Sequence, residues 1–289
     1  MKILAVIVTY YPDLDRLKKL IMTFKVEGID TIIIDNTPIA PDFTDIYGEF
    51  ICNEKNIGIA AAQNIGIIHG KKIKTNWIWF FDQDSSVSQQ FIIKFIKDMQ
   101  SNNNELIFAP CFLDEEKKFE YSIVDINKSG KRKKIIPSQI DADFYTSVAI
   151  SSGTLSHISV FDKVGVMDEN LFIDYVDTEW CLRCFQAGLK IRIIVNAHMY
   201  HSIGDNTIEI LRFKIPIHSP QRRYYRIRNS IKLLKYHHVP KRLAYREILF
   251  SFIHQLILII INPKRLEYSY YFIRGLIDGV KGKNGPFTK

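Results

Sequence analysis

Short apolar runs alternate with longer segments of helical spacing along the first hundred residues. Residues 3–8 are apolar throughout, whereas residues 14–24 carry apolar side chains three and four positions apart. Continuous apolar strands that alternate with amphipathic helices predict a parallel sheet covered by helices on both faces. The expected strands are 3–8, 31–34, 51–53 and 78–81, and the expected helices are 14–24, 59–69 and 91–99.

The pattern is less regular after residue 100. Residues 117–134 are highly charged and predict a mobile excursion, and a helix is expected to run from near Asp177 to Gln186 and to stop at Gly188. Further strands are expected at 107–110, 144–151, 191–195 and 198–201, and the C-terminal third predicts helices at 221–237, 242–261 and 266–280.

Residues 248–261 form an apolar stretch that only Ser251, His254 and Gln255 interrupt. Fourteen residues are too few to cross a hydrocarbon core, which takes about 20. The stretch is therefore either a buried core helix or a helix lying in a membrane interface. The interface is favoured by basic residues at both ends, which are Lys241, Arg242, Arg246, Lys264 and Arg265.

The charge is unevenly distributed. Residues 212–289 hold 17 Lys and Arg against three acidic residues, a net charge of +14, so the first 211 residues carry −6 of the total of +8. An acidic body with a basic tail predicts that the tail contacts something anionic. The N-terminus begins directly with a strand pattern and lacks the features of a signal peptide, which favours a cytosolic protein.

The four cysteines also suit a reducing compartment. Cys181 and Cys184 form a C-x₂-C pair, but no second pair or histidine cluster completes a zinc site at a plausible spacing. We therefore expect both to be packing residues. A hydrophobic content of 47% excludes a disordered chain.

The strand at 78–81 ends in two carboxylates, Asp82 and Asp84. Residues two apart in a strand point to the same side, and open α/β sheets bind ligands at the carboxyl ends of their strands. Such a pair suits Mg²⁺ or Mn²⁺ carrying a diphosphate. An Asp-x-Asp after a strand is also typical of a turn with helix-capping acids.

Other polar motifs follow the expected strands in order. The Asn56-x-Gly58 segment opens a helix of small residues that can approach a ligand or the sheet closely, and it does not match the dinucleotide fingerprint of dehydrogenases. The remaining motifs are Thr9-Tyr10-Tyr11, Asp35-Asn36, Asn64-Ile65-Gly66, Asp177-Thr178-Glu179-Trp180 and His201-Ser202-Ile203-Gly204.

With these motifs in this order, the chain resembles the family 2 glycosyltransferases, whose GT-A fold binds nucleotide-sugars. The resemblance covers nearly the whole length and is closest to bacterial rhamnosyltransferases that extend polysaccharides. It rests on Phe81-Asp82-Gln83-Asp84-Ser85, on Leu171-Phe172-Ile173-Asp174-Tyr175-Val176-Asp177, and on Arg223-Tyr224-Tyr225 with Arg228-Asn229.

The resemblance implies a role for each motif. Asp35 would recognise the base, with Thr9 and Tyr10 beside it, although an Asp before Pro38 is also typical of a turn. Asp84 would hold the metal, with Asp82 reaching the ribose or the second coordination shell. His201 would be a further metal ligand, although a polar strand residue is the other interpretation. Donor contacts are further expected from Asn56, Asn64 and Gln83.

An inverting transfer needs a base for the acceptor hydroxyl, and Asp177 matches the second position of the family's Glu-Asp motif. Val176 stands where the family often has Glu, so Asp174 or Glu179 could share the role, and Asp177 is also suited to helix capping. Either the diphosphate or an anionic acceptor could pair with Arg223, Arg226 and Arg228, which are equally typical of solvated helix charges.

The expected fold is thus α/β, a mixed, mainly parallel GT-A sheet at 1–211 with a helical extension at 212–289. Residues 1–100 would bind the nucleotide-sugar and 101–211 the acceptor. The expected reaction moves L-rhamnose from dTDP-L-rhamnose to a lipid-linked glycan of O-antigen or capsule, on the inner face of the cell membrane. The rivals are a nucleotidyltransferase and a nucleic-acid-binding protein, and the apolar 248–261 argues against the latter.

Overall fold

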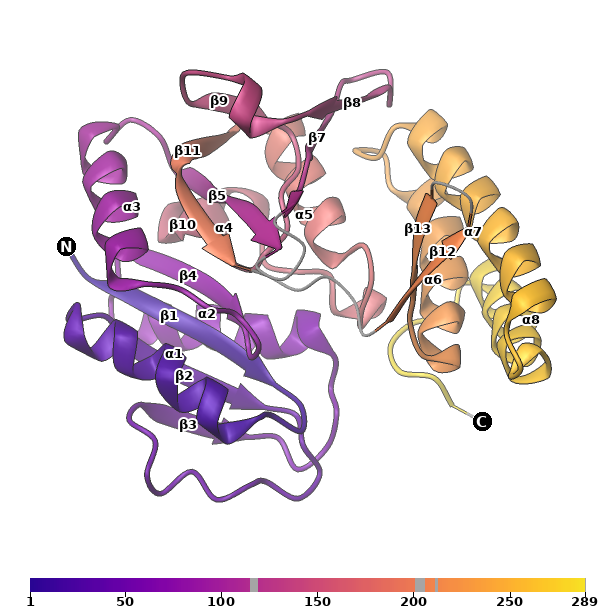
Figure 1. The fold of residues 1–289 in the computed structure, drawn as a ribbon, viewed down its shortest axis with the longest axis horizontal. Helices are drawn as coiled ribbons and strands as arrows, with labels where there is room; N and C mark the ends of the chain where they lie inside the picture. Colours follow the sequence, from indigo (N-terminus) through magenta and orange to yellow (C-terminus); the bar gives the residue numbers. More distant parts are fainter. Residues whose placement is uncertain (115–118, 201–205, 211–212, 289) are drawn as a thin grey trace.

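A computed structural model describes residues 1–114, 119–200, 206–210 and 213–288. These residues form a nine-stranded mixed sheet in the order β3-β2-β1-β4-β10-β5-β11-β9, with β6 paired to β5 (Figure 1). The sheet strands are β1 (Ile3–Thr9), β2 (Asp30–Asp35), β3 (Glu49–Cys52), β4 (Trp77–Asp82), β5 (Ile107–Asp114), β6 (Phe119–Glu120), β9 (Phe144–Thr146), β10 (Leu155–His157) and β11 (Ile191–Tyr200).

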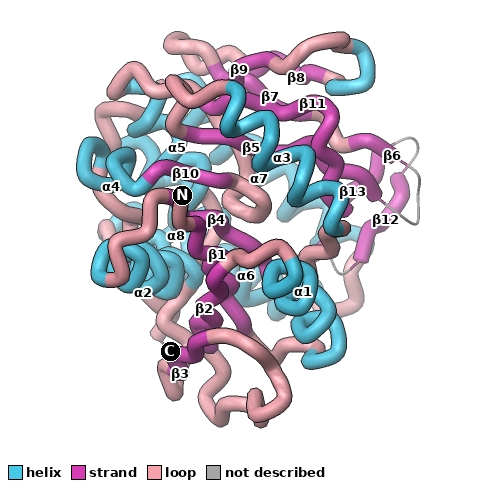
Figure 2. Tube along the Cα trace, turned by 90° about the vertical axis from the view of Figure 1, so that its left-hand side faces the viewer, coloured by secondary structure: helices cyan, strands magenta, loops and turns pink. Residues whose placement is uncertain are grey.

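Helices cover both faces of this sheet, as predicted. Alternate residues of each strand point to opposite faces, so Ile7 packs under α1 (Leu14–Val26) and α3 (Gln89–Ser101). Val6 packs on the other face, under α2 (Ile59–Lys72). Figure 2 shows α1 and α3 on one side of the strands and α2 on the other, together with α4 (Ile158–Val164) and α5 (Val176–Gln186).

The second half of the sheet differs from the prediction in three places. The strand expected at 144–151 pairs only over β9, and the strands expected at 191–195 and 198–201 form one strand, β11, with a shift in register between Ile194 and His198. The short strand β10 was not predicted. It runs antiparallel between β4 and β5 and makes the sheet mixed.

Part of the charged segment expected as an excursion is an ordered hairpin. β7 (Ile123–Ile126) pairs with β8 (Arg132–Ile135), and Asn127 Oδ1 accepts hydrogen bonds from the backbone N–H groups of Ser129 and Lys131 in the turn. Asn, Ser and Gly residues at 127–130 are typical turn formers. The prediction of a mobile segment was wrong for residues 123–135, because the charged residues of β8 do not show the apolar pattern by which a strand is recognised.

The C-terminal helices pack against one another at one end of the molecule (Figure 1). A two-stranded ribbon, β12 (Asn206–Ile210) and β13 (Phe213–Ile217), precedes them. Short 3₁₀ helices occur at Pro137–Gln139, Glu169–Leu171 and Leu233–Lys235, the last of which replaces the end of the helix expected at 221–237. The long helices are α6 (Pro220–Lys232), α7 (Lys241–Ile261) and α8 (Arg265–Lys281).

The contact between α6 and α8 depends on Gly275. A Cβ atom on Gly275 would lie 2.4 Å from the carbonyl oxygen of Tyr224 and 2.9 Å from its Cα. Gly275→Ala should therefore push the two helices apart and lower the free energy of unfolding by about 1–3 kcal/mol, measured by denaturant titration. The control is Ser269→Ala, because Ser269 is only half-buried and its hydroxyl donates to the carbonyl of Arg265 within α8. An equal effect of the two changes would contradict this account.

Candidate active site

Three neighbouring parallel strands bring the predicted residues to one edge of the sheet. Thr9 of β1 is paired with Asp35 of β2, and Val8 is paired with Asp82 of β4. Parallel strands end at the same edge, so the Thr9-Tyr10 segment and the two Asp motifs converge there. The motifs that follow these strands therefore share one surface.

Asp35 is held in one position by its neighbours. Its side chain is buried, and it accepts hydrogen bonds from the hydroxyl of Thr9 (2.7 Å) and from the hydroxyl and N–H of Thr37 (2.9 and 3.2 Å). The rings of Tyr10 and Tyr11 meet edge to face beside it and are both exposed. A fixed carboxylate next to exposed aromatic rings is a suitable arrangement for recognising a base.

Gln83 joins the ends of β1 and β4. Its side-chain oxygen accepts from the backbone N–H of Tyr10 at 2.7 Å, and its Nε2 donates to the carbonyl of Tyr10 at 3.2 Å. Both ends of the amide are therefore engaged by the backbone of Tyr10. In this structure Gln83 holds the backbone of Tyr10. The sequence had instead predicted that Gln83 contacts the nucleotide-sugar donor directly.

Asp82 sits in an environment of excess negative charge. Its backbone N–H donates to the hydroxyls of Ser85 and Ser152. Burial, followed by the charges of Asp84 and Asp177, raises the pKa of the Asp82 carboxyl to about 7. A divalent cation would relieve the crowding of negative charge that raises the pKa of Asp82, so this donor set fits a metal.

The described part of the chain does not contain a complete ligand set for such a metal. Among the described residues, no three His, Cys, Asp or Glu side chains converge as a metal site. His201, the predicted further ligand, lies outside the described residues.

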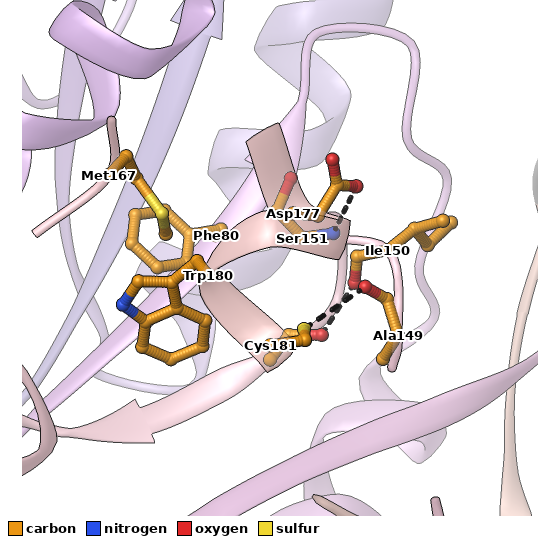
Figure 3. A pocket seen from close by; sticks show the side chains of 9 residues that line it. Phe80, Ala149, Ile150, Ser151, Met167, Asp177, Trp180 and Cys181 are labelled. Carbon is orange, nitrogen blue, oxygen red and sulfur yellow. Dashed lines mark hydrogen bonds between the residues drawn. The ribbon is translucent and has the colours of Figure 1, made fainter. Parts of the chain in front are cut away.

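Asp177 lies in the first turn of α5, facing the same edge. Its Oδ2 accepts from the N–H of Ser151 at 3.1 Å (Figure 3). Burial, and to a smaller extent the charge of Asp174, raises the pKa of the Asp177 carboxyl. A small cavity beneath it, between Phe80 and Trp180, has room for about one water molecule. That cavity is too small for a sugar.

The chain that leads into α5 has an unusual backbone. Phe172, Asp174 and Tyr175 have φ angles of 66°, 62° and 65°, in the left-handed region that non-glycine residues rarely adopt. Such conformations cost of order 1–3 kcal/mol each and cluster at functional sites. The last of these residues, Tyr175, stands two positions before Asp177.

Of the two other acids considered as the base, only Asp174 faces the site. Its carboxylate pairs with Arg222 (3.3 Å) and Arg226 (3.8 Å) of α6. Glu179 is buried and pairs with Arg183 (2.7 Å) and His238 (2.8 Å) on the far side of α5. Its carboxylate is already used within the fold.

The two asparagines expected to contact the donor make local contacts. Asn56 Oδ1 accepts from the N–H of Gly58 at 2.9 Å. Asn64 donates to the carbonyl of Met167 and to Glu169 and accepts from the N–H of Met167. Asn64 thus ties α2 to the segment that precedes the strained residues.

The arginines of α6 divide into two groups. Arg228 is fully buried and donates to backbone carbonyls, and Arg223 points to Ser251 of α7. Arg222 and Arg226 face Asp174, and the charge of Arg222 also offsets part of the rise in the pKa of Asp82 and of Asp177. Arg222 was missed by sequence reasoning, although its spacing of four from Arg226 places both on one helix face. Arg228 is therefore not included in our proposed donor site.

The architecture agrees with solved glycosyltransferase structures. S. aureus TarS (residues 1–349) superimposes with a TM-score of 0.58 at 12% identity, covering 97% of this chain and 81% of TarS. GalNAc-T7, solved with UDP, GalNAc and Mn²⁺, gives 0.55 at 11% identity, covering 91% and 58%. At these identities the likeness concerns the fold, which is GT-A.

Sequence comparison is more specific. The chain is 44% identical over 98% of its length to the dTDP-rhamnosyl transferase RfbF of Shigella flexneri, covering 97% of that protein. It is 21% identical to the galactofuranosyltransferase GlfT1 of Mycolicibacterium smegmatis, covering 64% of this chain and 65% of GlfT1. Residues 6–161 match the model of the glycosyl transferase family 2. With its ordered motifs and GT-A sheet, the chain belongs to glycosyltransferase family 2.

Proposed function

We propose that this glycosyltransferase transfers L-rhamnose from dTDP-L-rhamnose, with inversion, to a lipid-linked glycan acceptor. The observation that supports the donor most is the 44% identity to a dTDP-rhamnosyl transferase over nearly the full length of both chains. The geometry supports a nucleotide-sugar reaction, because a fixed Asp35 for the base and the acids for the diphosphate and the acceptor share one edge.

The residues of the site suggest how the reaction proceeds. Asp35 and Tyr10 bind the base of the donor. Asp82 and Asp84 lie next to the diphosphate of the bound donor. Asp177 accepts the proton of the acceptor hydroxyl as that oxygen attacks the anomeric carbon. Because burial raises its pKa, Asp177 is a stronger base than an exposed aspartate. Arg222 supplies positive charge both to Asp82 and to the acids near α5, Asp174 and Asp177.

Asp84, with Asp82 beside it, would hold Mg²⁺ or Mn²⁺. A bound divalent cation acts as a Lewis acid that neutralises the leaving diphosphate. The raised pKa of Asp82 supports this, since a cation would replace the proton that the crowded carboxylates otherwise attract.

A panel of nucleotide-sugars tests the donor and the reaction class together. With dTDP-L-rhamnose, an acceptor and Mn²⁺, the enzyme should release dTDP, while UDP-sugars should react more slowly. Release of pyrophosphate in place of nucleoside diphosphate would identify the rival nucleotidyltransferase. Equal rates with every donor would contradict the rhamnosyl assignment.

We also propose that α7 and α8 lie on an anionic membrane surface. α7 is long and apolar enough to cross a membrane, and only 28% of its apolar window is buried. Its inward face carries polar residues four apart (Glu247, Ser251 and Gln255) beside Leu243, Ala244 and Leu258, whereas most of the other apolar side chains point outward. The exposed apolar side chains of the two helices include Leu249, Phe250, Leu256, Ile260, Leu266, Tyr270 and Ile273.

The inverted polarity of α7 supports a lipid-facing helix, because a core helix buries its apolar side. Ion pairs with Arg132 of β8 and Arg226 of α6 hold Glu247 against the protein, which favours a helix lying on the surface over one that spans. Each flanking Lys or Arg adds about 1 kcal/mol on anionic lipid, and a membrane-linked acceptor would then meet the enzyme at the surface.

The triple change Leu249→Gln, Leu256→Gln and Ile260→Gln should reduce binding to anionic vesicles by more than about tenfold, since each removes apolar burial. Sedimentation with vesicles measures the effect. The matched control changes three exposed isoleucines of the catalytic domain, Ile39, Ile68 and Ile93, to Gln and should leave binding unchanged. If the wild-type protein never sediments and is instead a dimer, the apolar face is a protein interface.

A further inference from the structure

The strained residues before α5 need a restraint, because three left-handed non-glycine residues do not persist unaided. We call residues 171–175, which include all three, the catalytic loop. Its last residue is two positions before Asp177 in the chain. Its backbone leads directly into the first turn of α5, which carries Asp177.

Asn229 of α6 supplies a restraint from one side. This residue is fully buried, and its Nδ2 donates to the carbonyl oxygens of Leu171 (2.9 Å), Ile173 (2.7 Å) and Asp174 (3.1 Å). One amide nitrogen thus binds three of the five carbonyls of the catalytic loop. These bonds hold the three carbonyls around one point.

Arg228 orients this amide. Its Nε donates to Asn229 Oδ1 at 2.9 Å, which fixes the Nδ2 side toward the loop, and its Nη2 donates to the carbonyls of Leu171 (2.8 Å) and Asn170 (3.2 Å). Arg228 and Asn229, which are adjacent in α6, therefore both donate to the carbonyl of Leu171. Neither side chain has a contact that reaches Asp82, Asp84 or Asp177 in the structure.

The loop is held from the opposite side by α2. The N–H of Ile59 donates to the carbonyl of Phe172 at 2.9 Å, and Gly58, at φ 88°, leaves no room for a Cβ atom, which would lie 2.6 Å from the Phe172 ring. That ring stacks on Tyr225 of α6 at 4.9 Å. The catalytic loop is clamped between the start of α2 and the middle of α6.

We propose that Asn229 is a positioning residue for glycosyl transfer, which holds the catalytic loop so that Asp174 and Asp177 face the reacting groups. This inference rests on the proposed function of Asp177. The amide of Asn offers two N–H donors to the carbonyls and an acceptor to Arg228, and among the other neutral side chains only Gln, which is one methylene longer, carries the same group. A misplacement of about 1 Å at a reacting group can cost about 10²-fold in rate.

Asn229→Ala should lower kcat by about 10–100-fold, while the dissociation constant of the donor changes less than about twofold. Asn229→Ser, which keeps one donor, should fall between the wild type and Asn229→Ala. The matched control is Ser230→Ala on the same helix, because Ser230 is fully buried but bonds only to the carbonyl of Ile227 within α6. Circular dichroism checks the fold, and if Asn229→Ala is unfolded, the comparison uses Asn229→Ser.

A double-mutant cycle separates positioning from general structural damage. If Asn229 acts through Asp177, Asn229→Ala should cost little further kcat in an Asp177→Asn background. Losses that multiply would overturn the proposal, as would an unchanged kcat or a donor affinity that falls as much as kcat. Near-wild-type turnover of Asp177→Asn alone would remove the proposed base, and a large Asn229→Ala effect would then support positioning of Asp174.

Discussion

Asp84→Ala should abolish sugar transfer and metal-dependent donor binding while the fold stays intact. Asp84 follows β4 at the edge where Thr9, Asp35 and Asp82 converge, and its charge contributes to the raised pKa of Asp82. Removing it leaves the buried sheet unchanged, because the residue belongs to the turn after the strand. The loss should therefore appear in chemistry and in cation-dependent binding.

The measurement is donor binding and turnover with Mn²⁺ and with a chelator. Wild-type enzyme should lose donor affinity when the cation is removed, whereas Asp84→Ala should bind donor weakly in both conditions. The control is Asp162→Ala. Asp162 is an exposed aspartate of α4 that pairs with Lys71 in the last turn of α2. If Asp84→Ala keeps more than about a tenth of the activity, a loss under about 1.4 kcal/mol, the metal role is wrong.

Asp177→Asn should lower kcat by roughly 10²–10⁴-fold, the usual scale for a removed general base, and leave donor binding unchanged. Asparagine is isosteric and keeps an oxygen that can accept the Ser151 N–H, so the loop geometry should survive. Near-normal turnover would transfer the role to Asp174, because Glu179 is engaged by Arg183 and His238.

The pH dependence of kcat tests the same residue. The pKa of Asp177 is raised, so its basic form is lost as pH falls through a value above the 3.8 of an ordinary aspartate. Wild-type kcat should therefore decline on the acid side at a higher pH than an exposed aspartate would give, and the decline should be absent in Asp177→Asn. An identical acid limb in both proteins would assign it to another group.

Local pattern was sufficient for much of the fold and of the site. Buried parallel strands are apolar along their whole length, so β1, β2 and β4 were recognisable, and strands that are parallel must end at one edge. For that reason the convergence of Asp35, Asp82 and Asp84 followed from their places after the strands. Strand β10 was missed because three residues are too few to show a periodic pattern of apolar positions. Its antiparallel pairing with β4 depends on contacts between residues far apart in the chain.

The roles of the α6 arginines were beyond the sequence. The sequence of a basic helix does not indicate which arginines face a site and which face the interior. Only the packing shows that Arg228 donates to backbone carbonyls, whereas Arg222 pairs with Asp174. The same is true of α7. Its apolar composition was evident, but the direction of the side chains was decided by the polar partners that Glu247 finds on α6 and β8.

The sequence alone was enough to predict the sheet, the acidic edge and the family, because these depend on residue type and on short spacings along the chain. The tertiary structure alone revealed the catalytic loop and its clamp. Asn229 is more than fifty residues from the carbonyls that it binds, and left-handed backbone at Phe172, Asp174 and Tyr175 is not signalled by residue type. Such strain exists only where distant side chains hold it, so no local pattern in the sequence can record it.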